Sequence, residues 1–545
     1  MSARSVIISG AGPVGLVLAL DLARRGISST VLERREAGEP PSVKCNHVAS
    51  RTMEAFRRLG IAADVRGAGL PADYPNDCVY RTTVTQGHEI TRIPIPARAE
   101  RWTDFDGPDT WWPTAEPPHR INQIYLEPII FAHADAHPLI TIHNRTELVE
   151  AVQDEDGVTA TARNLDSGET MTLAAPYLIG CDGGRSLVRT IIGAKLSGDP
   201  VVQRVQSTYI RAPKLLGMLQ GRPGWMNLSL NPRRSGNTVA IDGKETWLIH
   251  CYLYEHEEDF DAIDRDAAIR TILGVGDDFD YEIISKEDWI GRRLVADKFR
   301  DRRIFICGDS AHLWVPYAGY GMNAGIADAM NLAWLLAGTL NGWGGAHLLD
   351  AYEAERLPIT EQVSHFAMNH AISAMAHRRE VPAEVEQDDD AGADARAGMG
   401  KRVYDLNVQQ YCCGGLNFGY FYPKSPLITY DGEQAPGYSM AGFQPSTVPG
   451  CRTPHFWRTN GRSAYDDFGA DYTLMRFDPA VDILPLQIAA AEAGVPLEII
   501  DIADDERTGV YRHALLLSRP DLHVAWRGDA LPDDVDGLVN RIRGA

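Results

Sequence analysis

The chain has 545 residues, too many for one hydrophobic core, so its length predicts several domains. Its hydrophobic content of 44% and charged content of 23% are ordinary for a globular protein. The formal net charge of −21 would repel anionic partners, so we expect neither nucleic-acid binding nor membrane-surface binding.

The eight cysteines have no framework spacing, and no C-x-x-C occurs. We therefore expect free thiols and a cytoplasmic location, and we predict no metal site. The apolar start at residues 6–8 stops at a glycine turn, too early for a signal peptide, and no apolar run reaches the roughly 18 residues of a membrane span.

Residues 6–34, VIISGAGPVGLVLALDLARRGISSTVLER, predict a strand, a tight turn, a helix and a second strand. The turn contains G-x-G-x-x-G, in which backbone can approach a pyrophosphate at the positive end of the helix. Glu33 ends the second strand, where a carboxylate can accept ribose hydroxyls. The predicted dinucleotide-binding residues are Gly10, Gly12, Pro13, Val14, Gly15, Glu33 and Arg34.

A second stretch, CGDSAHLWVPYAGYGMN (307–323), places Asp309 at a strand end and a glycine-rich turn before a helix. A flavin needs a hydroxyl acceptor for its ribitol and hydrogen-bond donors at its electron-rich edge. Asp309 can supply the first, and the backbone amides around Gly321, Met322 and Asn323 can supply the second. Gly319 and Gly321 let backbone lie against the ring.

With YLIGCDGGRSLVR (177–189), these two stretches resemble the single-component, class A flavoprotein aromatic hydroxylases. The resemblance covers nearly the first 375 residues. It implies tightly bound FAD, NADPH or NADH as a transient co-substrate, and O2 as the oxidant. It also implies an aromatic substrate hydroxylated through a flavin C4a-hydroperoxide, and a homodimer.

The resemblance extends to single residues. Arg51 matches an arginine near the flavin phosphates, although it could equally be a solvated helix charge. Gln123 and Asp182 match cofactor contacts, and Pro316 matches a proline beside the reactive edge of the flavin. Related phenol hydroxylases carry an Asp or His five residues before the arginine. Here that position is Asn46, which cannot act as a base, and His47 follows it.

Two hypotheses for His47 stay open, a substitute base that ionises a phenol and a packing residue beside the flavin. Plausible substrate contacts on predicted strands are Tyr209, Arg211, Trp225, Trp247 and Tyr252.

The predicted fold is α/β, a Rossmann-like FAD-binding domain with an interleaved β-sheet substrate domain. We assign residues 1–75, 120–190 and 291–400 to the FAD-binding domain and residues 76–119 and 191–290 to the substrate domain. The acidic segment 380–400 is predicted to be a mobile linker, whereas residues 328–376 predict long helices.

Residues 430–545 alternate between strand and helix patterns. The segments PGCRTPHFW and RPDLHVAWR resemble the thioredoxin-like C-terminal domain of some of these hydroxylases, but without a C-x-x-C a redox role is not expected.

GHEITRIPI (87–95) and residues 339–359 also resemble the dichlorochromopyrrolate-type oxygenases. The ring that is hydroxylated is therefore phenolic or heteroaromatic, and the substrate is either a small phenol or a larger polycyclic or heteroaromatic compound. The alternatives are a Baeyer–Villiger oxygenase, a reductase that does not use oxygen, and a non-catalytic flavin-binding partner.

Overall fold

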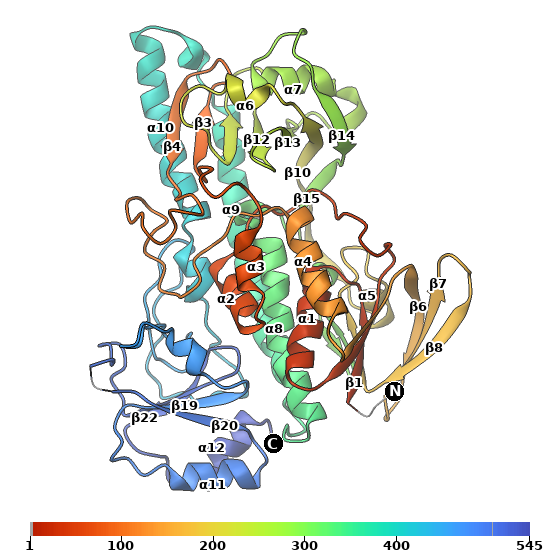
Figure 1. Ribbon diagram of the computed structural model, residues 1–545, viewed down its shortest axis with the longest axis vertical. Helices are drawn as coiled ribbons and strands as arrows, with labels where there is room; N and C mark the ends of the chain where they lie inside the picture. Colours follow the sequence, from red (N-terminus) through yellow and green to blue (C-terminus); the bar gives the residue numbers. More distant parts are fainter. Residues whose placement is uncertain (1–3, 504) are drawn as a thin grey trace.

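The computed structural model describes residues 4–503 and 505–545 (Figure 1). Its first sheet has six strands in the order β16-β17-β9-β1-β2-β5, all parallel except β16. The strands are β1 (Ser5–Ser9), β2 (Ser28–Leu32), β5 (Ile140–His143), β9 (Tyr177–Gly180), β16 (Arg300–Asp301) and β17 (Ile304–Ile306). Parallel neighbours bring the ends of β1, β9 and β17, far apart in sequence, to one edge.

Helices surround this sheet. They are α1 (Pro13–Arg24), α2 (Ser50–Arg58), α3 (Ala62–Gly67), α4 (Gln123–Asp135), α5 (Leu187–Ile191) and α8 (Tyr320–Leu340). Helix α1 packs against both α8 and α4. A separate three-stranded meander, β6 (Thr146–Gln153), β7 (Val158–Asn164) and β8 (Thr170–Ala175), projects to one side (Figure 1).

The second sheet has nine strands and lies beyond the carboxyl edge of the first (Figure 1). Its strands are β3 (Cys78–Arg81), β4 (Glu89–Ile93), β10 (Leu196–Arg211), β11 (Met226–Ser229), β12 (Gly236–Ala240), β13 (Thr246–Tyr252), β14 (Glu282–Lys286), β15 (Trp289–Ala296) and β18 (His312–Leu313). Helices α6 (Leu215–Met218) and α7 (Arg265–Leu273) accompany it. The prediction of strands through 76–119 was too broad, because residues 94–119 contain none.

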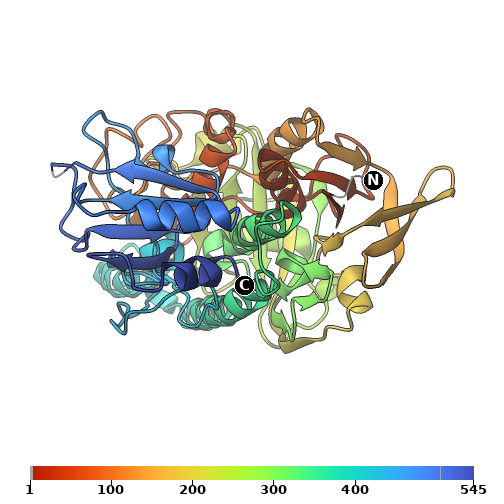
Figure 2. The ribbon, with the colours of Figure 1, turned by 90° about the horizontal axis from the view of Figure 1, so that it is seen from below.

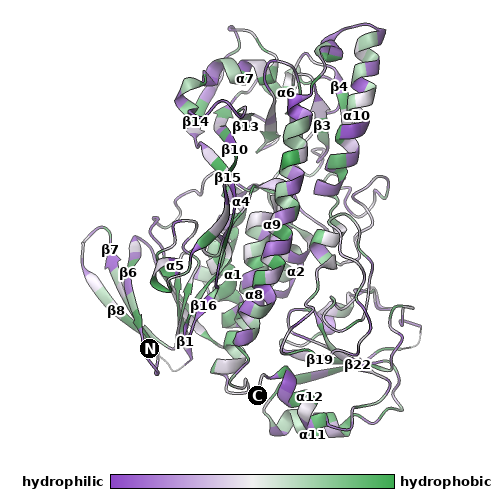
Figure 3. Ribbon diagram, turned by 180° about the vertical axis from the view of Figure 1, so that it is seen from behind, coloured by the Kyte–Doolittle hydropathy of each residue, from purple (hydrophilic) through white to green (hydrophobic). Residues whose placement is uncertain are grey.

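Two long helices follow α8. Helix α9 (Asp350–Arg379) runs from the first sheet to the second, and α10 (Asp390–Tyr411) packs against β4 and α9 (Figure 3). The prediction of long helices over 328–376 is confirmed. The segment 380–400 was predicted as a linker or loop. Residues 380–389 are irregular apart from one 3-10 turn (Ala383–Glu386), but α10 begins at Asp390, so the prediction was wrong for 390–400. The Asp389 side chain caps the start of α10, and Met399 and Val403 are buried against the second sheet.

The C-terminal region forms a four-stranded sheet, β20 (Leu497–Asp501), β19 (Tyr472–Arg476), β21 (Leu515–Ser518) and β22 (Val524–Gly528), with helices α11 (Leu484–Glu492) and α12 (Val535–Ile542). These elements confirm the predicted strands and helices. Its assignment as thioredoxin-like stays a prediction.

This region packs on α8, which Figure 2 shows in green between the C-terminal sheet (blue) and the six-stranded sheet (red). Trp334 of α8 meets Tyr472 edge to face at 6.0 Å. In the described part of the chain, no helix is both long and apolar enough to cross a membrane.

Candidate active site

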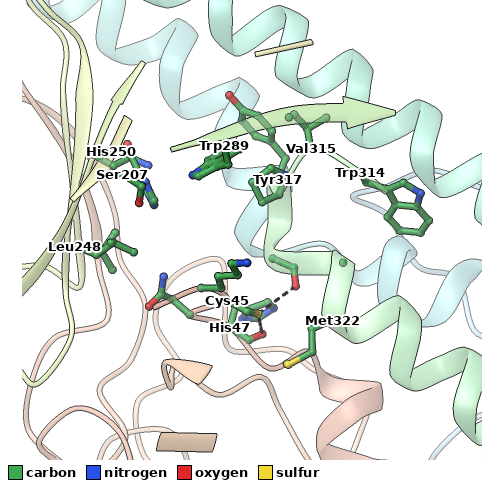
Figure 4. Close-up of a pocket in the computed structure, with 18 of the residues that line it drawn as sticks. Cys45, His47, Ser207, Leu248, His250, Trp289, Trp314, Val315, Tyr317 and Met322 are labelled. Carbon is green, nitrogen blue, oxygen red and sulfur yellow. Dashed lines mark hydrogen bonds between the residues drawn. The ribbon is translucent and has the colours of Figure 1, made fainter. Parts of the chain in front are cut away.

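A cavity of about 580 Å³ lies between the carboxyl edge of the six-stranded sheet and one face of the nine-stranded sheet. Figure 4 shows the two sides. Cys45, His47 and Met322 lie on the side of the first sheet, and Ser207, Leu248 and His250 lie on the second. Cavity-lining residues also come from α9 and α10.

The G-x-G-x-x-G turn forms one end of this cavity. Gly10 has φ +106°, and a Cβ there would lie 2.3 Å from the carbonyl oxygen of Cys181. A Cβ on Gly15 would lie 2.1 Å from the carbonyl oxygen of Gly10, so helix and strand approach too closely for side chains. A Cβ on Gly12, in contrast, would meet no atom within 4 Å. Gly12, Pro13 and Val14 therefore present open backbone to the cavity.

Glu33 lies beside this turn and accepts a hydrogen bond from the backbone N–H of Ala11 at 2.8 Å. Arg34 was predicted to bind cofactor, but its side chain is 75% exposed and pairs with Glu147 at 3.3 Å. Adjacent side chains at a strand end point to opposite sides, so only Glu33 faces the turn.

Asp309 follows β17 and lines the cavity. Among the described residues, its carboxylate accepts no hydrogen bond, and the surrounding protein, which reduces its solvation, raises its pKa above the usual aspartate value. The side chain is exposed to the open cavity, and a cofactor that displaced water from it would have to supply hydrogen-bond donors, as the hydroxyls of a ribityl chain would.

The glycine-rich turn faces the same space. Gly319 has φ +61° and a Cβ there would lie 2.9 Å from the Cβ of His47, whereas a Cβ on Gly321 would meet nothing within 4 Å. Asn323 is buried and fastens this turn, because its side chain accepts from Ala49 N–H at 2.9 Å and donates to the carbonyl of His47 at 3.1 Å. Open backbone at Gly12 and Gly321, with an unpartnered carboxylate between them in the lining, fits a flavin dinucleotide.

The comparisons with known proteins agree with this geometry. A family model described as FAD binding domain matches residues 3–367. The chain belongs to this FAD-binding family. It is 28% identical to the FAD-dependent monooxygenase apdD of Emericella nidulans, over 99% of this chain and 90% of the relative. It is 29% identical to phenol 2-monooxygenase of Pseudomonas sp., over 97% of this chain and 90% of the relative.

A solved structure of the rebeccamycin biosynthetic enzyme RebC with reduced flavin superimposes with a TM-score of 0.89, at 33% identity and 99% coverage of both chains. The protein is therefore an FAD-dependent monooxygenase with the aromatic hydroxylase fold, and NAD(P)H and O2 are its co-substrates. The predicted fold class, cofactor and enzyme class are confirmed.

The other predicted cofactor residues lie in different settings. Gln123 lines the cavity and donates to Glu127 at 2.9 Å. The Asp182 carboxylate accepts from the backbone N–H of Leu187 at 2.8 Å and from the hydroxyl of Ser310 at 3.0 Å. Asp182 therefore stabilises the start of α5. Its neighbours Cys181 and Gly183 line the cavity, but Asp182 does not.

The assignment of Arg51 to the flavin phosphates does not agree with its position. Its Nη2 lies 3.2 Å from Nε2 of His523, and its guanidinium lies 4.4 Å from the centre of the Tyr420 ring. Both partners belong to the C-terminal part of the chain, and Arg51 does not line the large cavity. A basic residue that does line it is Lys44, seven positions earlier, whose ammonium lies 2.7 Å from Glu287.

The catalytic candidates Asn46, His47 and Pro316 all line the cavity. The Asn46 side chain accepts from Asn122. Nδ1 of His47 is contacted by the guanidinium of Arg120, and both residues are buried. Burial, reinforced by the positive charge of Arg120, holds the pKa of His47 well below its usual value. The ring is neutral and a weak base, which argues against the substitute-base hypothesis.

The substrate wall is built from alternate residues of β13. Leu248, His250 and Tyr252 line the cavity, and Ser207 on β10 pairs with His250 in register. Burial lowers the pKa of His250 to about 4, so this ring is also neutral. Trp225 lines the cavity under Arg120, whose guanidinium lies 4.8 Å from its ring centre.

Three predicted substrate contacts lie elsewhere. Trp247 is fully buried in the core behind the sheet, because residues of odd separation on a strand face opposite sides. Tyr209 and Arg211 share the face of Ser207 but lie beyond the end of the cavity. Arg211 is 51% exposed and pairs with Glu245 at 2.9 Å.

Sequence reasoning missed two cavity-lining arginines, Arg120 and Arg378. Arg120 lies three residues before Gln123, in a segment that the dinucleotide pattern does not reach. Arg378 is at the end of α9, and no local signal distinguishes it from its neighbour Arg379.

Proposed function

We propose that this monooxygenase hydroxylates a phenolic ring of a fused-ring aromatic substrate. The observation that carries the proposal is the continuity of one largely apolar cavity from the open flavin backbone to the aromatic wall of the second sheet. Side chains on that wall include Trp225, Trp289 and Tyr252, and Tyr411 at the end of α10 adds a further aromatic ring to the lining. Such a lining suits a large flat ring system better than a single small phenol.

Arg120 is the residue to which we assign the proton step. Its Nε and Nη2 are buried and have no hydrogen-bond partner among the described residues. A cation at this position lowers the pKa of a nearby phenol by about 1–3 units and so favours the phenolate, whose ring carbons are better nucleophiles. In this account His47 positions Arg120, and the phenol proton passes to solvent as the substrate enters the cavity, so no side chain has to accept it.

When bound, FAD would pass the electrons of NAD(P)H to O2 and so activate the oxygen that is transferred. This chain's residues hold the ring and exclude water from the site. Pro316 and Val315 contribute apolar surface to the lining, close to the glycine-rich turn. The resemblance described above suggests that Pro316 lies beside the reacting edge.

Two predictions from the sequence, a homodimer and a cytoplasmic location, form part of this proposal. The resemblance to single-component hydroxylases supports the first and the free cysteines support the second. Sedimentation of the purified FAD-loaded protein tests the dimer, and fractionation of the source cells tests the location.

The test of the function uses the purified yellow protein in air with NADPH or NADH. Matched phenols of one, two, three and four fused rings are added, and coenzyme oxidation and products are followed together. We expect stimulation to rise with ring number and each product to gain one oxygen atom. If single-ring phenols coupled coenzyme oxidation to hydroxylation as efficiently as fused-ring phenols, the fused-ring assignment would be contradicted. Lactone products would indicate Baeyer–Villiger oxidation and not ring hydroxylation.

A further inference from the structure

Arg378 is a second cation in the cavity, separate from Arg120. It lies at the end of α9, and its guanidinium is held by neutral groups only. Nη1 donates to the hydroxyl of Tyr317 at 3.1 Å, and Nη2 donates to Oε1 of Gln203 at 2.5 Å. The guanidinium also lies 4.0 Å from the centre of the Tyr252 ring.

Two acids of this region form ion pairs with other bases. Glu255 pairs with Arg379 at 2.5 Å, and Glu287 pairs with Lys44 at 2.7 Å at the cavity edge. Among the described residues, no carboxylate forms an ion pair with Arg378, although enclosed arginines are ordinarily paired. His377 lines the cavity beside it, and burial lowers the pKa of that ring, which disfavours a second positive charge there.

The guanidinium of Arg378 has N–H donors that form no hydrogen bond to the described residues. An arginine has five N–H donors, and two are used here by Tyr317 and Gln203. Gln203 is itself buried and anchored by a bond to the carbonyl of Leu253 at 3.3 Å, so the guanidinium is fixed before any ligand arrives. A pre-positioned arginine fork with free donors fits a planar carboxylate.

Figure 4 shows Tyr317 across the cavity from Cys45 and His47. The end of the cavity marked by Tyr317 and Arg378 is therefore distinct from the end where Arg120 meets His47. We propose that Arg378, with Tyr317 and Gln203, forms a carboxylate subsite, and that the substrate is an aromatic acid. The phenolic ring reacts near Arg120 while the carboxylate is held by Arg378. This inference rests on the proposed function and deepens it by naming the substrate class.

The test measures binding to the FAD-loaded enzyme by the change in flavin absorbance. The probes are two matched pairs, benzoate with benzamide and 2-naphthoate with 2-naphthamide, which differ in charge but hardly in shape. Arg378→Gln removes the charge and Arg378→Lys keeps it. Arg379→Gln is the matched control, because Arg379 is the next residue of the same helix, is 50% exposed and pairs outside the cavity.

We expect the wild type and Arg379→Gln to bind at least one carboxylate about tenfold or more tightly than its amide. Arg378→Gln should lose most of that preference while keeping FAD, and Arg378→Lys should retain part of it. Equal affinity for acid and amide in the wild type, or no response to any probe, would overturn the subsite. An unchanged preference in Arg378→Gln would overturn it too.

Failure of this subsite is distinguishable from failure of the proposed function. Efficient hydroxylation of neutral fused-ring phenols, with no advantage for their carboxylated counterparts, removes the subsite and leaves the function. Binding of naphthoate that depends on Arg378, without hydroxylation of any phenol in the panel, supports the subsite and removes the function.

Discussion

The guanidinium of Arg120 directly contacts Nδ1 of His47 inside the cavity, and both side chains are buried. One partner has to stay uncharged, because two buried cations in contact would repel each other. Histidine is the weaker base of the two, so the positive charge belongs to Arg120. In the proposed mechanism, therefore, Arg120 favours ionisation of the phenol by stabilising the phenolate electrostatically, and His47 does not act as a base.

Replacing His47 with Gln should lower turnover most for phenols of high pKa, as Arg120→Gln does but more weakly, because the ring acts by positioning Arg120 and accepts no proton. Since the folded pKa lies well below 6.5, the ring is neutral at higher pH, and the stability that this neutral form contributes is lost as pH falls below about 6.5. The pH–rate profile of the variant should therefore match that of the wild type above that pH. If His47→Gln lowered turnover as strongly in the Arg120→Gln background as in the wild type, His47 would act independently of Arg120 and would be restored as the base.

Arg120→Gln should raise the pKa of a bound phenol by about 1–3 units, and turnover should fall most for the least acidic phenols. Absorbance titration of an enzyme-bound naphthol measures this pKa directly. Arg120→Lys restores the positive charge and should recover part of the shift. If phenol pKa in the Gln variant equals that in the wild type, Arg120 has no electrostatic role.

Gly321→Ala separates the needs of the fold from those of the cofactor. Its added Cβ meets no protein atom within 4 Å, and the position is in the first turn of α8. The apoprotein should gain about 0.5–1 kcal/mol in unfolding free energy, as helical Gly→Ala changes do. FAD affinity should nevertheless fall roughly tenfold, because the methyl group enters the flavin space. Gly217→Ala, also in open space but outside the cavity, is the control.

Asp309→Ala should weaken FAD binding strongly, since it removes the cavity-lining carboxylate assigned to the ribityl hydroxyls. We expect at least a tenfold rise in Kd, measured by flavin fluorescence titration of the apoprotein. Asp301→Asn, in the adjoining strand β16, is the control. Full retention of flavin by Asp309→Ala would show that this carboxylate serves the fold alone.

Arg51→Ala should lower the melting temperature without changing FAD affinity, because its contacts are with His523 and Tyr420. Removing a buried charged partner costs about 1–3 kcal/mol. Calorimetry and FAD titration on the same preparation measure both quantities. A large loss of flavin affinity with unchanged stability would return Arg51 to the phosphate site.

Local motifs were predictable because their chemistry and their geometry are both encoded within a few residues. Gly12, Glu33, Asp309 and Gly321 each belong to a turn whose conformation restricts the sequence. The helix α10 was not predictable from its acidic, weakly apolar start. It is stabilised by burial of its second half on the distant strand β4, which no local pattern reports.

The substrate wall shows the same limit. Trp247 and Tyr252 cannot both contact the substrate, contrary to the sequence-based prediction, because they lie five residues apart and face opposite sides of β13. The register of β10 against β13 then decides which end of the shared face borders the flavin. That register places Ser207 in the cavity and Tyr209 beyond it, and it depends on pairing across some 40 residues of sequence.

The most direct test of the account is a single-turnover reaction of the FAD-loaded enzyme with a fused-ring hydroxynaphthoate, NADPH or NADH, and isotopically labelled O2. The account predicts a ring-hydroxylated product carrying one labelled oxygen atom for each coenzyme oxidised. Coenzyme oxidation that yields only hydrogen peroxide, with the hydroxynaphthoate and every other aromatic acid or phenol recovered unchanged, would contradict it.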